Sequence, residues 1–353
     1  MKGRPTAAGT ERDRTSTPPN QSHVLSAVAS QPAHPMALAA LLQFAASRTD
    51  IARSLTVLRW LEVLGLPTDS IGRQRSMLSR IDKTFRHRDT VVELTGPFET
   101  RDIPGVGPLK FSTATGAARA FLALLDREGA GYEPGVLRYL VEAGRRGCLV
   151  ADVGAHVGYY STILGAAGAR VIAFEMHPDL LLEVKRNLWA NRLDRSHVIN
   201  AAVGNYDGLI FNVRFDPTPG LRVEDTIAAP PPNAIDKALY DPVLSVRLDT
   251  VFAREGVIPD LIKIDIEGYE FEALEGARKL IAGGRTRFLL EFHPHLVGAF
   301  GRKPEEILAV FPAGWSREVL EDDGTRRPID PSGSDFAYAP DVENIKLLFC
   351  PPD

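Results

Sequence analysis

The chain has 353 residues, of which 44% are hydrophobic and 24% charged, a composition that excludes a largely disordered or fibrous protein. Its 41 Lys and Arg residues nearly balance 45 Asp and Glu residues, so the formal net charge of -4 provides no overall basic field for nucleic acid or anionic lipid. Two cysteines are too few for a disulfide framework or a cysteine-rich zinc site. No stretch reaches the roughly 18 apolar residues that would span a bilayer. We therefore expect a cytoplasmic protein with a small-molecule partner, and neither a nucleic-acid nor a membrane partner.

The N-terminal quarter of the chain divides into two parts. Residues 1–35 are rich in Thr, Ser, Pro, Gln and Arg, which predicts a disordered tail. Between residues 36 and 95, leucines recur at spacings of three and four, which predicts a helical region. These helices could form the contact of a homodimer. The main domain is expected at 96–353, with its core at 131–296 and a short strand pair near its start.

From Cys148 onward, short apolar runs alternate with helical patterns. The predicted strands are 148–153, 170–175, 197–203, 261–266 and 288–292, and the predicted helices between them are 159–167, 179–192 and 269–281. Apolar strands separated by helices bury both faces of a parallel sheet, so we expect an open α/β fold. The terminal runs 315–320 and 344–349 predict an antiparallel hairpin at one sheet edge. Two further strand-like runs flank a Pro-rich insertion at 230–232.

A glycine turn follows the first of these strands, in the segment Asp152-Val-Gly154-Ala-His156-Val-Gly158. The pattern lacks the third glycine of a dinucleotide fingerprint, and an aspartate at the strand tip would repel a pyrophosphate. The same aspartate suits a ligand that carries an ammonium and a sulfonium, as S-adenosylmethionine does. Glycines let the backbone turn tightly and approach such a ligand closely.

The second strand ends at Glu175, where Rossmann-type folds place the acid that accepts hydrogen bonds from ribose hydroxyls. A glycine turn alone is a weak indication of nucleotide binding. Because the acid stands at the end of the next strand, the two features together favour a nucleoside-containing cofactor.

A second acidic cluster follows the strand at 261–266, in the sequence Lys263-Ile-Asp265-Ile-Glu267. Residues two apart on an extended strand share a face, so these three side chains should lie on the same side. Asp265 or Glu267 could orient the cofactor or accept a proton from the substrate. Asp265 could instead cap the following helix. Meeting acids could also hold Mg²⁺, although the sequence gives no clear metal site.

His293 follows the last core strand, in Glu291-Phe-His293-Pro-His295. Histidine titrates near neutral pH, so His293 is a candidate general base, and a loop histidine without catalytic duty is the alternative. A His-x-His zinc site lacks a clear third ligand.

These segments resemble the FkbM family of S-adenosylmethionine-dependent methyltransferases, which have the class I Rossmann-like fold. The similarity is carried by Tyr132-Glu-Pro, by the glycine turn through Ser161, by Phe174-Glu175 with Pro178, and by Ile262-Lys-Ile-Asp265-Ile-Glu267-Gly-Tyr-Glu270 followed by Leu274-Glu-Gly-Ala. The last element is the most specific, because many methyltransferases share the glycine turn.

The resemblance implies roles for individual residues. On the cofactor side these are Asp152, Gly154, His156 and Gly158 at the methionine, Glu175 at the ribose, Asn200 and Ala201 at the adenine, and Tyr132 and Glu133 as a cover from the N-terminal side. Asp265 and Glu267 would lie near the transferred methyl group. His156 and Met176 depart from the usual Asn and Pro of the family, and neither change removes a charge that the chemistry needs.

The implied activity is O-methylation of a hydroxyl on a sugar, polyketide or other secondary metabolite. An NAD(P)-dependent oxidoreductase is an alternative within enzymes, and a catalytically silent cofactor-binding scaffold is an alternative outside them.

Overall fold

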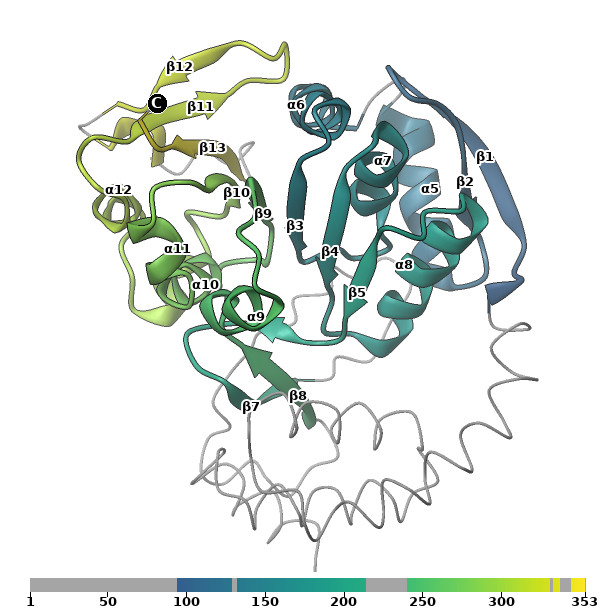
Figure 1. Ribbon diagram of the computed structural model, residues 1–353, viewed down its shortest axis with the longest axis horizontal. Coiled ribbons are helices and arrows are strands. Elements are labelled where there is room, and N and C mark those ends of the chain that lie inside the picture. Colours follow the sequence, from purple (N-terminus) through teal and green to yellow (C-terminus); the bar gives the residue numbers. More distant parts are fainter. Residues whose placement is uncertain (1–93, 129–131, 214–239, 331–332, 337–343, 353) are drawn as a thin grey trace, which may run out of the picture.

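The computed structural model describes residues 94–128, 132–213, 240–330, 333–336 and 344–352 (Figure 1). The predicted tail, almost all of the predicted helical region and the Pro-rich insertion lie outside these residues.

An eight-stranded sheet of order β12-β11-β13-β10-β9-β3-β4-β5 forms the centre of the fold (Figure 1). The strands are β3 (Leu149–Val153), β4 (Arg170–Phe174), β5 (His197–Ile199), β9 (Leu261–Ile264), β10 (Arg287–Phe292), β11 (Ser316–Leu320), β12 (Arg326–Pro328) and β13 (Ile345–Cys350). Strands β5, β4, β3, β9 and β10 are parallel, whereas β13 pairs antiparallel with both β10 and β11. The predicted open, mostly parallel sheet with an antiparallel C-terminal edge is therefore confirmed.

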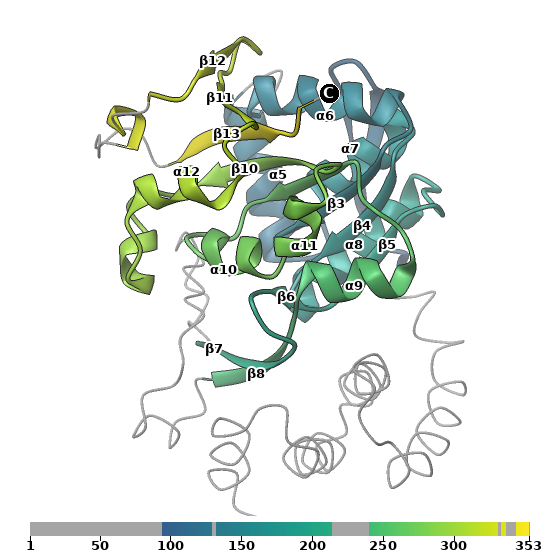
Figure 2. The ribbon, with the colours of Figure 1, turned by 60° about the vertical axis from the view of Figure 1, so that its left-hand side comes forward.

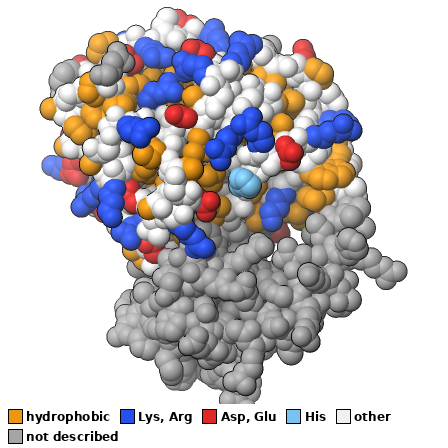
Figure 3. Space-filling view, viewed as in Figure 1, with side chains coloured by type: hydrophobic (Ala, Val, Ile, Leu, Met, Phe, Trp, Pro, Cys, Tyr) orange, Lys and Arg blue, Asp and Glu red, His pale blue; other side chains and the backbone are white. Residues whose placement is uncertain are grey.

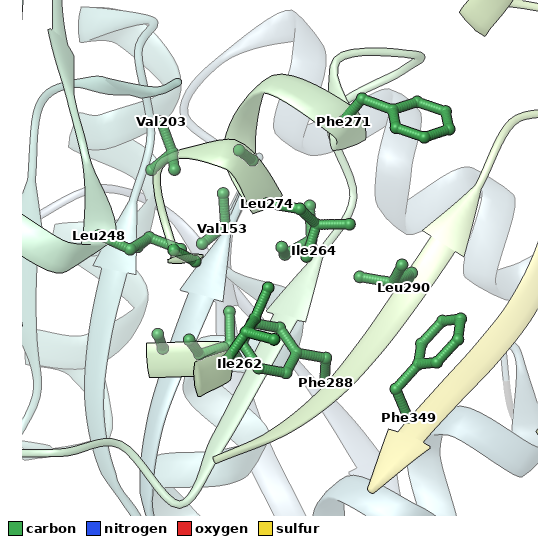
Figure 4. Packing of buried hydrophobic residues seen from close by; sticks show 14 of the residues in the cluster. Val153, Val203, Leu248, Ile262, Ile264, Phe271, Leu274, Phe288, Leu290 and Phe349 are labelled. Carbon is green, nitrogen blue, oxygen red and sulfur yellow. The ribbon is translucent and has the colours of Figure 1, made fainter. Parts of the chain in front are cut away.

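Helices cover both faces of this sheet (Figure 2). One face carries α5 (Gly116–Glu128), α6 (Pro134–Arg145), α7 (Tyr159–Ala167) and α8 (Pro178–Ala190), and the other carries α9 (Leu248–Glu255), α10 (Glu270–Glu275), α11 (Arg278–Ala282) and α12 (Ile307–Val310). Alternate residues of each strand pack against opposite helical layers: Ile262 and Ile264 of β9 face the second layer, and Leu261 faces the first. Figure 4 shows the second layer, where Leu274 of α10 lies over Ile264.

An N-terminal hairpin extends the first helical layer. Strands β1 (Phe98–Ile103) and β2 (Gly107–Ser112) pair antiparallel, which confirms the predicted strand pair. Asn187 of α8 and Asn191, which directly follows the helix, attach the hairpin. The Asn187 carboxamide oxygen accepts from the Ser112 amide at 2.6 Å, and that of Asn191 accepts from the Lys110 amide at 2.9 Å. The chain then runs through α5 to Tyr132, at the start of α6.

A small sheet of order β6-β8-β7 lies apart from the main one; its strands are β6 (Ala202–Val203), β7 (Gly208–Val213) and β8 (Tyr240–Val246). The run predicted as one strand at 197–203 is thus divided between two sheets. The helix predicted at 269–281 is also divided, into α10 and α11. Gly276, between them, lies against the chain after β6, where a Cβ would be 2.0 Å from the Gly204 carbonyl oxygen. Among the described residues, no helix is both long enough and apolar enough to cross a membrane.

Candidate active site

The strand order reverses between β3 and β9. After β3 the chain crosses through α7 on one face of the sheet, and after β9 it crosses through α10 on the other face. Open α/β sheets bind ligands at the carboxyl ends of strands at such a switch point. Every predicted site residue other than Tyr132 and Glu133 lies at the carboxyl end of β3, β4, β5, β9 or β10 or in the segment that follows it.

The glycine turn after β3 lies between the ends of the two neighbouring strands. The amides of Gly154 and Ala155 both donate to the Phe174 carbonyl at 3.0 Å, which ties the turn to β4. On the other side, a Cβ on Gly154 would be 1.9 Å from the Asp265 carbonyl oxygen, and φ of Gly154 is +81°. Only glycine satisfies both conditions, so the first glycine of the motif lets the loops after β3 and β9 approach each other.

The predicted ribose and adenine residues meet at the end of β4. Glu175 is 5% exposed, and its carboxylate accepts hydrogen bonds from the amides of His156 and His177, each at 2.8 Å. The Asn200 carboxamide donates to the Glu175 and Met176 carbonyls at 2.9 and 3.0 Å. Ala201 is 1% exposed and belongs to the core, and its amide donates to the Ile199 carbonyl at 3.1 Å.

Asp152 lies beneath the glycine turn rather than on its surface. It is 1% exposed, and its Oδ2 accepts a hydrogen bond from the Ser161 hydroxyl of α7 at 2.5 Å. Burial, reinforced by the Asp265 carboxylate, raises the pKa of Asp152, while Lys263 and Ser161 oppose the rise. Its Oδ1 is buried and has no hydrogen-bond partner among the described residues. A buried, unpartnered carboxylate oxygen fits a ligand that brings a cation such as the ammonium of S-adenosylmethionine.

The remaining residues predicted on the methionine side lie around the turn. Gly158 has φ of +82° and packs against Val184 of α8. A Cβ at position 158 would lie 2.9 Å from the Val184 Cα. His156 is exposed, adopts φ of +53°, and its ring centroid is 5.6 Å from that of Phe121. Three residues with positive φ, Gly154, His156 and Gly158, thus give the turn its shape.

The predicted catalytic residues form a second cluster, at the ends of β9 and β10. Potential ligand atoms of Asp265, Glu267 and His293 all lie within 4.8 Å of one another. Glu267 adopts φ of +53°, an uncommon conformation for a residue other than glycine. The Lys263 ammonium is 3.1 Å from the Asp265 carboxylate, and His293 Nδ1 is 3.1 Å from Glu270. This spacing would admit a cation, but Lys263 already places a positive charge beside Asp265.

Opposing influences set the protonation of this cluster. Burial alone would raise the pKa of Asp265, but Lys263 and His293 outweigh it and lower that pKa. Burial alone would lower the pKa of His293, but Glu270, Asp265 and Glu267 outweigh it and raise that pKa. Asp265 is therefore ionised at neutral pH, and His293 holds its proton more tightly than an ordinary histidine. Of the two, Asp265 is the better candidate to accept a hydrogen bond from a substrate hydroxyl.

Tyr132 and Glu133, which were predicted to cover the site, directly precede α6. Glu133 adopts φ of +47°, and this conformation turns its carboxylate inward: it accepts from the Tyr160 hydroxyl at 2.6 Å and pairs with Lys346 of β13 at 2.7 Å. The Tyr132 ring packs edge-on to Phe121 with centroids 5.6 Å apart.

A buried polar cluster between β10 and β13 was not predicted from the sequence. Glu291 is 7% exposed, accepts a hydrogen bond from the Asn344 carboxamide at 2.5 Å, and lies 3.9 Å from the Lys346 ammonium. One signal could have found it, because Glu291 and Lys346 each interrupt an otherwise apolar, buried strand. A charge on such a strand needs a partner, and here the partners come from distant parts of the chain.

The topological switch, the glycine turn and the acid at the neighbouring strand end define a class of protein, the Rossmann-like S-adenosylmethionine-dependent methyltransferases. Residues 152–318, just under half of the chain, match the model of the methyltransferase FkbM domain family. The family decides against the oxidoreductase alternative and implies the use of S-adenosylmethionine.

Individual relatives are distant. The chain is 24% identical over 201 residues to the hexuronic acid methyltransferase AglP of Haloferax volcanii, an alignment that covers 56% of this chain and 76% of AglP. Among solved structures, it is similar to a methyltransferase FkbM from Methylobacillus flagellatus, with 18% identity, a TM-score of 0.35 and coverage of 57% of this chain. The chain spans 43% of the length of that protein. The chain is also similar to a methyltransferase from Agrobacterium tumefaciens, with 14% identity and a TM-score of 0.36. This match covers 73% of this chain and 71% of the Agrobacterium protein.

Proposed function

We propose that this protein transfers a methyl group from S-adenosylmethionine to a hydroxyl on a sugar, polyketide or other secondary metabolite. One relationship carries the proposal: the glycine turn after β3 is hydrogen-bonded to Glu175 on one side and contacts the backbone of Asp265 on the other. A nucleoside-binding acid and an ionised carboxylate thus flank the same turn.

The chain's residues have distinct tasks in this account. The cofactor supplies an electrophilic methyl group when bound. Glu175 holds the ribose hydroxyls, Asp152 receives the ammonium group, and the backbone around Asn200 and Ala201 faces the adenine. These assignments use groups that are buried or nearly so, where hydrogen bonds to charged groups contribute about 1.5–3 kcal/mol each.

Asp265 orients the acceptor hydroxyl and receives its proton. A hydroxyl is a weak nucleophile, and a positioned proton acceptor typically speeds such a reaction by about 10²- to 10⁴-fold. Glu267 and His293 flank Asp265, and the imidazolium form of His293 would stabilise the ionised carboxylate.

A hydroxylated small molecule as acceptor agrees with two observations. On the face in Figure 3, the described Lys and Arg side chains are spread among acidic and hydrophobic ones, and this face has no continuous basic patch for nucleic acid. The distant similarity to a hexuronic acid methyltransferase favours a sugar within the proposed acceptor classes.

The proposal is tested by incubating the full chain with methyl-labelled S-adenosylmethionine and a panel of neutral sugars, hexuronic acids and hydroxylated polyketides. Mass spectrometry should detect a labelled product with at least one hydroxyl class. Asp265→Asn should suppress it, whereas Asp126→Asn, on the exposed face of α5, should not. Cofactor binding without label transfer to any acceptor, including whole-cell extract, would instead indicate a silent binding protein.

A further inference from the structure

Glu291 is a buried carboxyl group that faces the candidate proton acceptor. It lies on β10 between Leu290 and Phe292, whose side chains pack into the opposite layer, so Glu291 points toward α6 and α7. Only 7% of it is exposed. The parallel neighbour β9 leads directly into Asp265, and the two acidic side chains meet on this face.

The register of β9 and β10 brings the two acids side by side: Leu290 pairs with Ile264, and Glu291 and Asp265 are the residues that follow them. The Glu291 Oε1 accepts a hydrogen bond from the Asn344 carboxamide at 2.5 Å, which leaves the other carboxyl oxygen for its neighbour at the end of β9. Ionised carboxylates have only acceptor atoms, so two of them cannot share a hydrogen bond unless one carries a hydrogen. Buried acid pairs of this kind hold one proton between them because both cannot ionise at short range.

We propose that Glu291 is protonated at neutral pH and donates a hydrogen bond to Asp265, which makes it a positioning residue for the candidate proton acceptor. The hydrogen bond fixes the direction of the Asp265 carboxylate and stabilises its ionised form. The catalytic consequence rests on the proposed function, whereas the protonation of Glu291 does not.

The local charges place the proton on Glu291 rather than on Asp265. Two lysines face three carboxyl groups here: Lys263 is 3.1 Å from Asp265, and Lys346 is 2.7 Å from Glu133 but 3.9 Å from Glu291. Each ammonium thus has a closer partner than Glu291. Burial, with the carboxylates of Asp265 and Glu133, raises the pKa of Glu291 well above its ordinary value, and the two lysines oppose this.

Every packed element contributes to this environment. The titratable groups that face Glu291 are Asp265 and Lys263 from β9 and the loop after it, Lys346 from β13, Glu133 and Tyr132 from the start of α6, and Tyr160 from α7. The Tyr160 hydroxyl donates to Glu133, so it supplies no hydrogen bond to an ionised Glu291.

Infrared spectroscopy of the ligand-free protein tests the protonation directly. A neutral carboxyl group has a C=O stretch that an ionised one lacks. At pH 7 we expect such a band in the wild type, and its loss in Glu291→Gln. Glu142→Gln, at an exposed glutamate of α6, is the matched control and should leave the band in place. Asp152 could add a second band, which Glu291→Gln should not remove. If the Glu291→Gln difference spectrum contains only carboxylate bands, the proposal is wrong.

Two substitutions then test the positioning role. Glutamine has the shape of a protonated glutamate and can still accept from Asn344 and donate to Asp265, whereas methionine can do neither. Glu291→Met should lower label transfer by about tenfold or more and move the acidic limb of its pH profile upward, because Asp265 loses a stabilising donor. Glu291→Gln should recover most of that loss. Equal losses in both variants would overturn the role, since they would show that an ionised Glu291 is needed.

The two proposals fail in different ways. If the wild type transfers no label, the proposed function fails, but the infrared result for Glu291 stands. If Glu291→Met does not fold, the spectra of Glu291→Gln and the wild type still decide the protonation.

Discussion

The amide nitrogen of His156 donates a hydrogen bond to the Glu175 carboxylate over 2.8 Å. This contact joins the glycine turn after β3 to the acid at the end of β4, the two features that the sequence pairs as a nucleoside site. The position of the acid and the shape of the turn therefore depend on each other, and a change at either should affect cofactor binding.

Asp265→Asn should separate chemistry from binding. Asparagine has the same shape as aspartate but cannot take up a proton, so methyl transfer should fall by about 10²- to 10⁴-fold. Affinity for S-adenosylmethionine should change little, because Asp265 lies at the end of β9, away from Glu175 at the end of β4. Calorimetric binding and label transfer measured on one preparation check both parts. Full activity in this variant would show that Asp265 is not the proton acceptor.

Gly154→Ala should destabilise the fold. The added methyl group would lie 1.9 Å from the Asp265 carbonyl, at a backbone φ of +81° that alanine disfavours. We expect a loss of about 1–3 kcal/mol in the free energy of unfolding, measured by chemical denaturation. Gly314→Ala is the control, since a Cβ there meets nothing within 4 Å. Equal stability of the two variants would argue against the close approach of the loops.

His293 should make stability depend on pH, with a contribution that is lost as the pH rises. Because its folded pKa is raised by Glu270, Asp265 and Glu267 against the effect of burial, its contribution is fully present below its unfolded pKa of about 6.5. The contribution is lost as the pH rises through the folded value. The difference in unfolding free energy between the wild type and His293→Gln should therefore shrink from pH 6 to pH 9.

The control for this titration is His197→Gln, at an exposed histidine of β5. Its difference from the wild type should remain small at both pH values. A His293→Gln difference that does not change with pH would mean that the imidazole binds no extra proton in the folded state.

Removal of divalent cations should leave methyl transfer intact. The Lys263 ammonium, 3.1 Å from Asp265 and 3% exposed, already supplies a buried positive charge at the acidic cluster. Assays with and without a chelator measure this directly. A loss of activity that Mg²⁺ restores would contradict it.

Much of the fold could be predicted because local patterns determine it. Helix α7 begins and ends where its periodicity indicates, at Tyr159 and Ala167. The elements that differ depend on contacts between distant segments. Gly276, at the end of α10, packs against Gly204 from another part of the chain. Strand β13 lies between β10 and β11 with β12 outermost, an order that no local pattern encodes.

The site residues likewise fall into those that local sequence patterns predict and those that depend on contacts between distant segments. Glu175 and Asp265 could be found because each stands at the end of an apolar run. The depth of Asp152 and the group around Glu291 could not, since Glu133, Glu291 and Lys346 come together only when the start of α6 meets β10 and β13. Their spacing along the chain carries no sign of this.

Calorimetric titration of the full chain with S-adenosylmethionine, beside an identical titration with NADH, tests the central claim most directly. We predict saturable binding of S-adenosylmethionine alone. Glu175→Ala should weaken it by about tenfold or more, since each hydrogen bond to a charged group contributes about 1.5–3 kcal/mol. Glu99→Ala, at an exposed position of β1, should not weaken it. Binding of NADH in preference to S-adenosylmethionine, or unchanged affinity in Glu175→Ala, would contradict the account.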